Sequence, residues 1–557
     1  MRAKVLATWL GVMASVALAA AAEAGPTLGP AYAVSARTSP FAGCTRDDVK
    51  GQEKALDAVN YPNSEIEPWV EVNPRDGANL IAGWQQDRWS DGGARGLVSA
   101  ASFDGGRTWT IVPVPKITKC SGGPWTRATD PWIAFSPDGA AYFFSLGFDN
   151  APPTGGDGPN AMLVSRSTDG GRSWGDPVTL IKDTDPRFFN DKNAITADPK
   201  DSRYVYAVWD RLEDLDQGSD ADEGAIGRPS LGQLAQLSGN IMQAKRGPRL
   251  GRSGTAALAA RAYPGDPLPP LFKGPTWFAR TTDGGRTWQK ARKIYDPGTN
   301  NQTLGNLIQV LPDGTVVNFL TEIKNFTTEA YQVTLRLQRS TDHGATFLPA
   351  RNGIAITERF AFGVYTPDEL IPVRDGLDLF DVATDPRNGT LYAVFQDYRF
   401  RSFQFEGFTL GDEVAFAMST DGGLTWSRVI RINQTPSNRA NRFRQQAFLP
   451  SIAVAGDGTL VATYYDFRND DDSGELADYW AVICNPKTAD CSRREGWTKE
   501  LRLTRRSFDY YNAPYAGGLF LGDYMGLAGK GQTVQALYGI ADRFDESSLF
   551  VRAIGLP

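Results

Sequence analysis

The chain has 557 residues, of which 41% are hydrophobic and 22% charged, and it contains 58 glycines and 35 prolines. This composition predicts a globular, turn-rich protein, long enough for several domains or one large repeat architecture. The formal net charge of −6, without a basic arm or stripe, argues against nucleic acid as the main partner.

The first 24 residues have the pattern of a secretory signal peptide. Arg2 and Lys4 precede an apolar run over residues 5–22, and Ala-Glu-Ala ends at Ala24. This order predicts cleavage after Ala24 or Ala22. A membrane anchor is the alternative, although the run is short and ends in small residues. We therefore expect an exported protein, extracellular or periplasmic, with no membrane span after signal cleavage.

The four cysteines suit an oxidising compartment. Cys484 and Cys491 are close enough in sequence to close a hairpin, which leaves Cys44 with Cys120. Three pairings are possible in principle, and the spacing does not match a four-cysteine zinc site. We predict two disulfides and no metal.

Near-copies of one eight-residue segment, here called the octets, recur along the chain. They are SFDGGRTW (102–109), STDGGRSW (167–174), TTDGGRTW (281–288), STDHGATF (340–347) and STDGGLTW (419–426). Each follows a segment of alternating apolar residues, so each is expected to turn one strand into the next. The glycines permit positive φ, the aspartate can accept backbone N–H groups, and the final aromatic can pack on an apolar layer. We interpret the octets as structural turns and not as catalytic sites.

The only histidine, His343, replaces a glycine in the fourth octet. Unless His343 itself takes part, a Ser-His-Asp triad and HExxH zinc chemistry are excluded. We expect His343 to be a surface turn residue.

Wider units surround the octets and share a strand, a turn with Gly or Asp, and a second strand. They cover residues 67–87, 130–147, 191–210, 306–322, 380–397, 449–466 and 524–542. With the loop, third strand, octet and fourth strand that follow, they predict an all-β fold, a β-propeller of four-stranded antiparallel blades. Seven blades are expected, with six as the alternative.

The last two units depart from the pattern. In the sixth, CNPKTADC (484–491) replaces the octet, and the seventh lacks a fourth strand. The N-terminal segment, 25–60, around Glu53 to Asn63, could supply that strand and close the ring. The domain plan is therefore a signal peptide over 1–24, this segment, and a propeller over 61–557 with an insertion at 213–273. The insertion begins acidic and turns basic and Gly-rich, and it is either a lid over the mouth of the ring or a disordered excursion.

The octets resemble the Asp-box, or BNR repeat, S-x-D-x-G-x-T-W, of sialidases and their propeller relatives. The resemblance covers nearly the whole mature chain. It implies an exo-sialidase-like glycoside hydrolase that acts on an acidic or other terminal sugar at the central mouth. Non-catalytic carbohydrate- or protein-binding propellers also carry these boxes, so a binding propeller is the alternative. A purely structural surface protein is the third hypothesis. Sialidases hold the substrate carboxylate with three arginines, the first in an Arg-Ile-Pro motif, whereas the opening strand here, EIEPWVEV, has no arginine.

Other arginines recur after the second strand of a unit, and we expect them to bind substrate on the face opposite the octets: Arg88, Arg211, Arg399, Arg468 and Arg543. The alternative is Asp–Arg pairs between blades, worth ~0–1 kcal/mol each at the surface. Charged or polar residues also recur at the starts of the innermost strands, where they should ring the mouth: Glu67, Asp130, Asp191 with Lys192, Asp381, and Asp523 with Tyr524. They could supply a general acid, bind a cation or substrate, or cap strand ends.

The resemblance to sialidases also implies a tyrosine nucleophile, because an acidic sugar repels an anionic one. Tyr524 is the candidate, with Glu67 as its base, Asp130 as the general acid, and Arg543 or Arg468 lowering the pKa of the tyrosine. Alternatively, Tyr524 packs on a neighbouring blade with its hydroxyl bonded to Asp523. We expect a glycan or glycoconjugate partner, no nucleic acid, no cofactor, and a monomer.

Overall fold

The computed structural model describes residues 25–44, 58–149, 158–215, 272–325, 332–401, 404–405, 408–409, 411–471, 475–542 and 545–557. These residues form strands and short 3-10 turns, the latter at η1 (Lys119–Ser121), η2 (Arg442–Gln445), η3 (Arg494–Gly496) and η4 (Tyr510–Asn512). The strands form several four-stranded antiparallel sheets, which confirms the predicted all-β class. A search of the described helices found none with the length and hydropathy needed to cross a membrane. The predicted signal peptide and most of the predicted insertion lie outside the described residues.

Most sheets contain consecutive strands paired in chain order. The first sets are β2 (Asn60–Val72), β3 (Leu80–Trp89), β4 (Ala94–Ser102) and β5 (Thr110–Pro113); β6 (Arg127–Phe135), β7 (Ala141–Phe148), β8 (Asn160–Ser167) and β9 (Val178–Asp183); β10 (Phe188–Ala197), β11 (Val205–Asp214), β13 (Thr276–Thr281) and β14 (Arg292–Tyr295); and β15 (Gln302–Val310), β16 (Val316–Lys324), β17 (Gln332–Ser340) and β18 (Ile354–Glu358). The remaining sets are β21 (Phe380–Thr384), β22 (Leu391–Asp397), β25 (Glu413–Ser419) and β26 (Ile430–Arg431); β27 (Ala447–Val454), β28 (Leu460–Asp466), β29 (Leu476–Cys484) and β30 (Lys499–Arg502); and β32 (Gly526–Lys530), β33 (Thr533–Asp542), β34 (Asp545–Gly555) and β1 (Thr27–Ala33).

A few short strands lie outside these sets. They are β12 (Phe272–Lys273), β19 (Val364–Tyr365), β20 (Pro372–Val373), β23 (Gln404–Phe405), β24 (Phe408–Thr409) and β31 (Phe508–Asp509). One residue pair, Ala94 with Ala128, also links β4 to β6.

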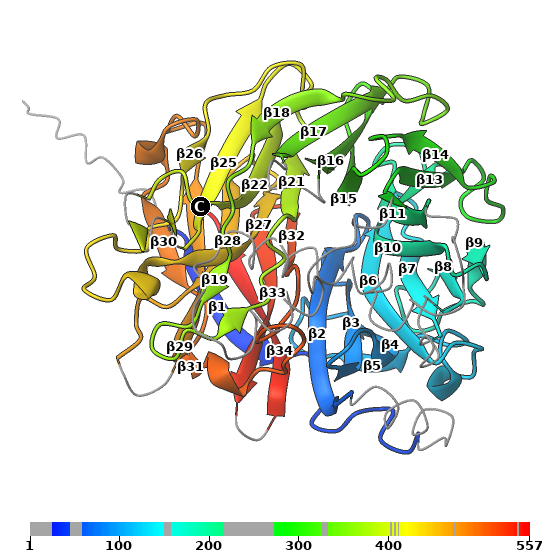
Figure 1. Cartoon of the computed structure of the whole chain (residues 1–557), viewed down its shortest axis with the longest axis horizontal. Coiled ribbons are helices and arrows are strands. Elements are labelled where there is room, and N and C mark those ends of the chain that lie inside the picture. Colours follow the sequence, from blue (N-terminus) through cyan, green and yellow to red (C-terminus); the bar gives the residue numbers. More distant parts are fainter. Residues whose placement is uncertain are drawn as a thin grey trace, which may run out of the picture.

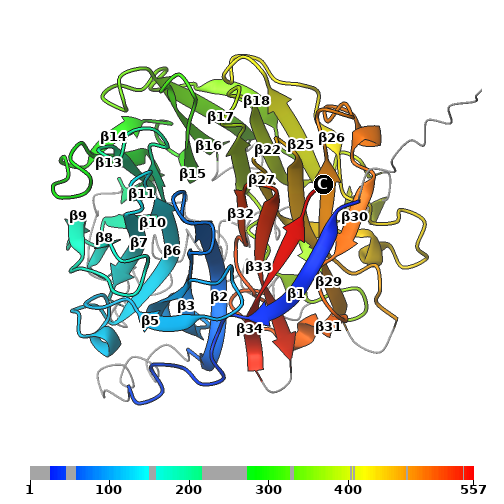
Figure 2. The ribbon, with the colours of Figure 1, turned by 180° about the vertical axis from the view of Figure 1, so that it is seen from behind.

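The sheets stand around a common centre in a propeller-like arrangement (Figure 1). The first strand of each set, such as β2, β15 or β27, lies nearest the centre, and the later strands lie farther out. Seen from behind, β1 lies alongside β34, so strands from the two ends of the chain are neighbours (Figure 2). The arrangement brings loops from distant parts of the sequence together in the middle of the molecule.

The last sheet takes its outer strand from the beginning of the chain. β1 pairs antiparallel with β34, from Thr27 opposite Gly555 to Ala33 opposite Phe550. The strand is therefore Thr27–Ala33 and not the stretch around Glu53 to Asn63. The final residues of that stretch instead begin β2, and the part over 45–57 lies outside the described residues.

Every octet uses the same hydrogen bonds. In the first, the Ser102 hydroxyl donates to Asp104 at 2.9 Å and accepts the amide of Gly106 at 2.9 Å. The carboxylate of Asp104 also accepts the amide and hydroxyl of Thr108, at 2.9 and 2.7 Å. The corresponding aspartates of the other octets bond in the same way: Asp169, Asp283, Asp342 and Asp421. The prediction that the octets are structural turns is confirmed.

His343 occupies a backbone position that suits glycine. Its φ is 53°, in the left-handed region that costs a side-chain-bearing residue roughly 1–2 kcal/mol. The imidazole stacks on Tyr204 with the ring centroids 4.4 Å apart. With 44% of its side chain exposed, His343 is the surface turn residue that the sequence predicted.

Both predicted disulfides are formed. Cys44–Cys120 joins the N-terminal segment to the turn η1, which lies beyond β5. Cys484–Cys491 closes the turn after β29, where the octet is missing. A covalent link therefore stands in the sixth unit where hydrogen bonds close the others.

Large apolar side chains fill the space between neighbouring sheets. Phe144 of β7 meets Trp209 of β11 edge to face at 6.1 Å, and Phe319 of β16 meets Trp426 of the fifth octet in the same way at 6.1 Å. The final aromatic of an octet thus packs on a neighbouring strand, so each turn also contributes to the contact between sheets.

We expect Asp283→Asn to lower the melting temperature at pH 7 and to flatten its dependence on pH below 4. The hydroxyl and amide of Thr287 lower the pKa of Asp283 from 3.8 to about 2. A lowered pKa contributes stability that is present above pH 3.8 and lost as the pH falls through about 2. Calorimetry at pH 7, 4 and 2.5 measures this, with the exposed Asp176→Asn as the control. Parallel pH profiles for wild type and Asp283→Asn would contradict it.

His343→Gly should be more stable than His343→Ala, by about 1 kcal/mol or more, because only glycine adopts φ near 53° without a steric cost. Both variants lose the stacking on Tyr204, so the difference between their free energies of unfolding measures the cost of the positive φ alone. Urea unfolding of the two variants measures it, and equal midpoints would show that the turn is not strained.

Candidate functional site

Several of the innermost strands contain a β-bulge at corresponding positions. Pairing with the second strand is interrupted at these positions in β2, β6, β10, β15 and β27. At each interruption one residue has a positive φ: Glu67 (56°), Asp130 (55°), Lys192 (48°), Gly305 (67°) and Leu449 (52°). Such bulges re-aim side chains, and strained non-glycine residues concentrate at functional sites. The charged members of this set are thus within the strands, and not at the strand starts as predicted.

An ion cluster, here called the central cluster, joins residues from several sheets. Lys192 Nζ lies 2.5 Å from Asp523 Oδ2 and 3.9 Å from Glu67 Oε1. Arg374 donates to both oxygens of Asp523, at 3.1 and 2.6 Å. The Lys192 amide donates to Asp130 at 3.0 Å. Side-chain exposure is 11% for Lys192 and Arg374, 5% for Asp523 and 1% for Glu67, so the charges of the first three residues interact with little solvent screening.

Arg88 reaches this cluster through an amide. Its guanidinium donates to Gln85 at 2.8 Å, and the Gln85 amide donates in turn to Glu67. Arg88 and Arg374 also lie over the ring of Phe520, at 5.2 and 4.2 Å from its centroid. Among the predicted substrate arginines that the structure describes, Arg88 is therefore the one linked to the central cluster, through Gln85.

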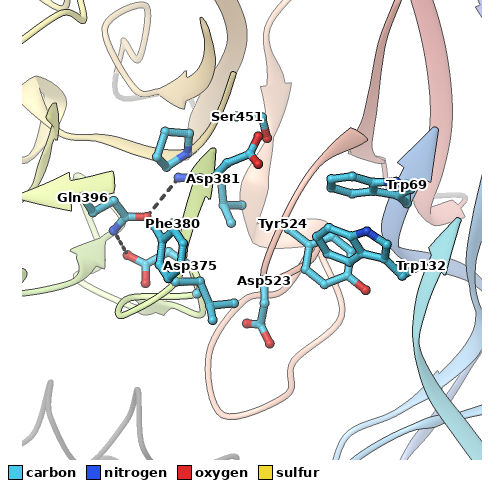
Figure 3. A pocket seen from close by; sticks show the side chains of 13 residues that line it. Trp69, Trp132, Asp375, Phe380, Asp381, Gln396, Ser451, Asp523 and Tyr524 are labelled. Atoms are coloured by element: carbon cyan, nitrogen blue, oxygen red, sulfur yellow. Dashed lines mark hydrogen bonds between the residues drawn. The ribbon is translucent and has the colours of Figure 1, made fainter. Parts of the chain in front are cut away.

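Aromatic rings lie beside the charges. Trp69 stacks on Trp132 with the centroids 3.7 Å apart, and Tyr524 meets Trp132 edge to face at 5.1 Å (Figure 3). The Tyr524 hydroxyl donates to the Pro131 carbonyl at 3.3 Å, and not to Asp523. The two tryptophans belong to the repeated sequences Glu-Pro-Trp and Asp-Pro-Trp at the bulges of β2 and β6. That repeat was the sequence signal by which they could have been found.

Two small pockets flank Tyr524. One is lined by Trp69, Trp132, Asp375, Asp381 and Asp523 among others (Figure 3), and the second by residues that include Asp130, Lys192 and Asn306. Each of these pockets, lined by described residues, has room for about one or two water molecules. The pockets thus bring the aromatic rings together with Asp523, Lys192 and Asp130 of the central cluster.

The central cluster pushes the pKa values of its carboxyl groups apart. Burial, and then the charge of Asp130, raise the pKa of Glu67 from 4.5 to about 8. Burial and Asp130 likewise raise the pKa of Asp191 to about 7. Burial would also raise the pKa of Asp523, but Arg374 and Lys192 hold it well below its ordinary value. At neutral pH Glu67 therefore keeps a proton beside an ionised Asp523.

The surroundings of Tyr524 favour its neutral phenol form. Burial and the neighbouring carboxyl of Glu67 raise the pKa of Tyr524 well above 10.0. Of the two arginines expected to lower that pKa, Arg468 pairs with Asp466 at 2.5 Å and with Glu500 at 2.6 Å, and Arg543 lies outside the described residues.

The remaining predicted residues are divided between the centre and other ion pairs. Arg211 pairs with Asp183 at 2.7 Å, and Arg399 with Asp397 at 2.7 Å. Asp381 lines a pocket and accepts the amide of Ile452 at 2.8 Å. The structure thus brings together Glu67, Asp130, Asp191, Tyr524 and Arg88, and gives Arg211, Arg399 and Arg468 carboxylate partners of their own. Sequence reasoning missed Arg374, which lies in an irregular loop that matches no repeat.

A group of three carboxyl groups lies elsewhere. Candidate ligand atoms of Asp368, Asp470 and Glu475 lie within 4.8 Å of one another. Arg444 donates to Asp470 at 2.6 Å and to Asp368 at 3.4 Å, and Glu475 accepts the Glu369 amide at 2.7 Å. These protein partners account for the grouping.

No protein-family model and no curated protein sequence matches this chain. Among solved structures, a protein of unknown function from Dyadobacter fermentans DSM 18053 has a TM-score of 0.43 and 14% identity, and the match covers 90% of this chain and 98% of that one. An α-L-arabinanase of Penicillium chrysogenum, complexed with arabinobiose, has a TM-score of 0.41 and 13% identity over 79% of this chain and 94% of its own. A Trypanosoma rangeli sialidase, in complex with the inhibitor DANA, has a TM-score of 0.38 and 13% identity over 88% of this chain and 55% of its own. Sialidases and arabinan-active enzymes are thus among the structures matched over most of the chain.

Glu67→Gln should flatten the loss of stability between pH 5 and pH 8. Below pH 4.5 both states hold the Glu67 proton, but between 4.5 and about 8 only the folded state keeps it, so wild-type stability falls as the pH rises through this window. Glutamine does not titrate, so it removes this pH dependence of stability, and its side-chain oxygen can still accept the hydrogen bond from Gln85. Melting temperatures at pH 5 and 8 measure the effect, with the 78% exposed Glu495→Gln as the control. An unchanged slope in Glu67→Gln would contradict the raised pKa.

Proposed function

We propose that the sheets form a seven-bladed β-propeller. The support is the set of four-strand groups that begin with β2, β6, β10, β15, β21, β27 and β32, each with its first strand innermost (Figure 1). β1 acts as the fourth strand of the last group, and the single pair Ala94–Ala128 joins two groups without merging their own strands. On this proposal residues 27–33 belong to the propeller as well as the predicted 61–557.

We propose that this propeller is an exported glycoside hydrolase that acts on a terminal sugar at the central cluster. One observation carries the proposal: Lys192 contacts both Glu67, which is protonated at neutral pH, and Asp523, which is ionised. Glycoside hydrolysis needs a proton donor for the leaving oxygen and a negative charge near the developing oxocarbenium ion. Groups whose pKa values are pushed apart in one site supply that pair.

The geometry suggests different roles from those that the resemblance implied. Glu67, with a pKa of about 8, is suited to be the general acid and not the base. Asp130, which lines the second pocket, takes the role of the base that activates water. Asp523 is held by two cations and stabilises positive charge without accepting a proton. Tyr524, as a neutral phenol, contributes a ring face and a hydrogen bond and not a nucleophile.

A carbohydrate-binding propeller without catalysis is the second candidate. The stacked Trp69 and Trp132 beside a small pocket favour it, because such rings can bind a sugar whether or not it reacts. Turnover separates the two candidates, since binding alone releases no product.

The purified mature protein should release nitrophenol from at least one 4-nitrophenyl glycoside in a broad panel. On that substrate Glu67→Gln should lower kcat by about 10²–10⁴-fold, the usual contribution of general acid catalysis, with a smaller change in KM. For a substrate whose leaving group needs no proton, such as a dinitrophenyl glycoside, the same variant should show a much smaller fall in kcat.

Two further variants sharpen this test. Tyr524→Phe should keep kcat within about tenfold of wild type if the phenol is not the nucleophile, and the exposed Glu495→Gln should leave kcat unchanged. Ligand binding without turnover of any glycoside would favour the binding propeller. Full activity of Glu67→Gln would remove Glu67 from catalysis.

A further inference from the structure

We propose that the central site takes an uncharged sugar and discriminates against sugars that carry a carboxylate. This inference rests on the proposed function, because it assumes that the ligand is a sugar bound at the central cluster. It departs from the acidic substrate that the octet resemblance allowed.

The cations of the central cluster have partners within the protein. Arg374 holds both carboxylate oxygens of Asp523, and Lys192 Nζ lies 2.5 Å from the same carboxylate. Arg88 donates to Gln85 and lies over Phe520. A ligand carboxylate would have to displace Asp523 to reach Arg374 or Lys192.

Asp523 occupies the place that the carboxylate of an acidic ligand would need. It accepts a two-point hydrogen bond from one guanidinium and a third contact from an ammonium, which is the geometry by which cations recognise a carboxylate. It is 6% exposed and belongs to the segment that leads into β32. The protein thus fills its own anion site with a side chain.

The walls of the two pockets carry carboxyl groups, aromatic rings and one cation, Lys192. The pocket shown in Figure 3 is lined by Asp375, Asp381 and Asp523, and none of the described residues that line it is a lysine or an arginine. The second pocket is lined by Asp130 and by Lys192, whose backbone amide donates to Asp130 and whose ammonium pairs with Asp523. An incoming carboxylate would lose its water beside the ionised Asp523, and the cation that lines these pockets, Lys192, is already paired with that residue.

The walls of these pockets offer binding partners to an uncharged sugar. Its hydroxyl groups can donate to the carboxyl oxygens of the pocket, and its C–H faces can pack on the rings of Trp132, Tyr524 and Phe380. Neither contact requires a cation from the protein. The site therefore offers acceptors and ring faces to a donor-rich, uncharged ligand.

The first experiment compares matched sugars on the wild-type chain. Methyl glucoside with methyl glucuronide, and methyl galactoside with methyl galacturonide, differ only by a carboxylate, and N-acetylneuraminate is added as a third acid. Calorimetric titration at pH 6.5 is expected to show at least tenfold tighter binding of an uncharged sugar than of its acidic partner. Tighter binding of any acid than of its uncharged partner, or binding of N-acetylneuraminate with neither uncharged glycoside bound, would overturn the inference.

The second experiment frees the internal anion site. Asp523→Asn removes the negative charge that Arg374 and Lys192 share, so the variant should bind the acidic sugars at least tenfold more tightly than wild type. Asp176→Asn, a surface variant that touches neither cation, should show no gain. No gain in a folded Asp523→Asn would overturn the inference.

A third variant covers the case in which Asp523→Asn fails to fold. Asp130→Asn also removes a carboxylate from the centre and retains an oxygen that can accept the Lys192 amide, so it should show a smaller gain of the same sign, and a loss or no change would count against the inference. The binding of acidic sugars by these two variants tests the inference even when neither sugar of a pair binds the wild-type protein. If the proposed catalytic function is wrong, no glycoside of the panel is turned over, and this result does not depend on which sugars bind.

Discussion

Burying the carboxylate of Asp523 at the centre of the molecule requires cations beside it, because an unpaired buried charge costs several kcal/mol. Arg374 and Lys192 meet that requirement, and they come from the loop before β21 and from β10. Lys192 in turn is placed by its positive φ at a bulge, and its amide is fixed by Asp130 of β6. This small set of charges therefore links the inner strands β2, β6 and β10 to the segment that leads into β32.

The same residue type behaves in opposite ways at the two places where it recurs. In the octets, aspartates lie at least partly in solvent and accept several local hydrogen bonds, which hold the pKa of Asp104, Asp283 and Asp421 at about 2. Near the centre, burial dominates and raises the pKa of Asp191 and Asp381 to about 7. The octets hold ionised carboxylates that support turns, whereas the inner strands hold carboxyl groups that can exchange protons near neutral pH.

Bulges connect these electrostatics to the proposed chemistry. A regular inner strand would alternate its side chains between the two faces of the sheet, whereas the bulges in β2, β6 and β10 break that alternation at one level. The backbone strain at Glu67, Asp130 and Lys192 is compensated by the ion pairs and hydrogen bonds that these residues make. A site built in this way has little freedom to rearrange, and this supports discrimination by charge as well as by shape.

The sequence by itself determined the octet turns and the repeated strand pattern, because each depends on residues that are close in sequence or recur at a fixed spacing. It also predicted the two disulfides, because pairing the nearby Cys484 and Cys491 leaves Cys44 with Cys120. Repetition also identified Glu67, Asp130 and Tyr524 as candidates, since equivalent positions of a repeat face the same centre. Tertiary structure alone decided that Arg374 reaches Asp523 while Arg211, Arg399 and Arg468 pair elsewhere, because the reach of an arginine depends on loops that follow no repeat. It also decided that Glu67 holds its proton, because a pKa follows from burial and from charges contributed by strands far apart in the chain.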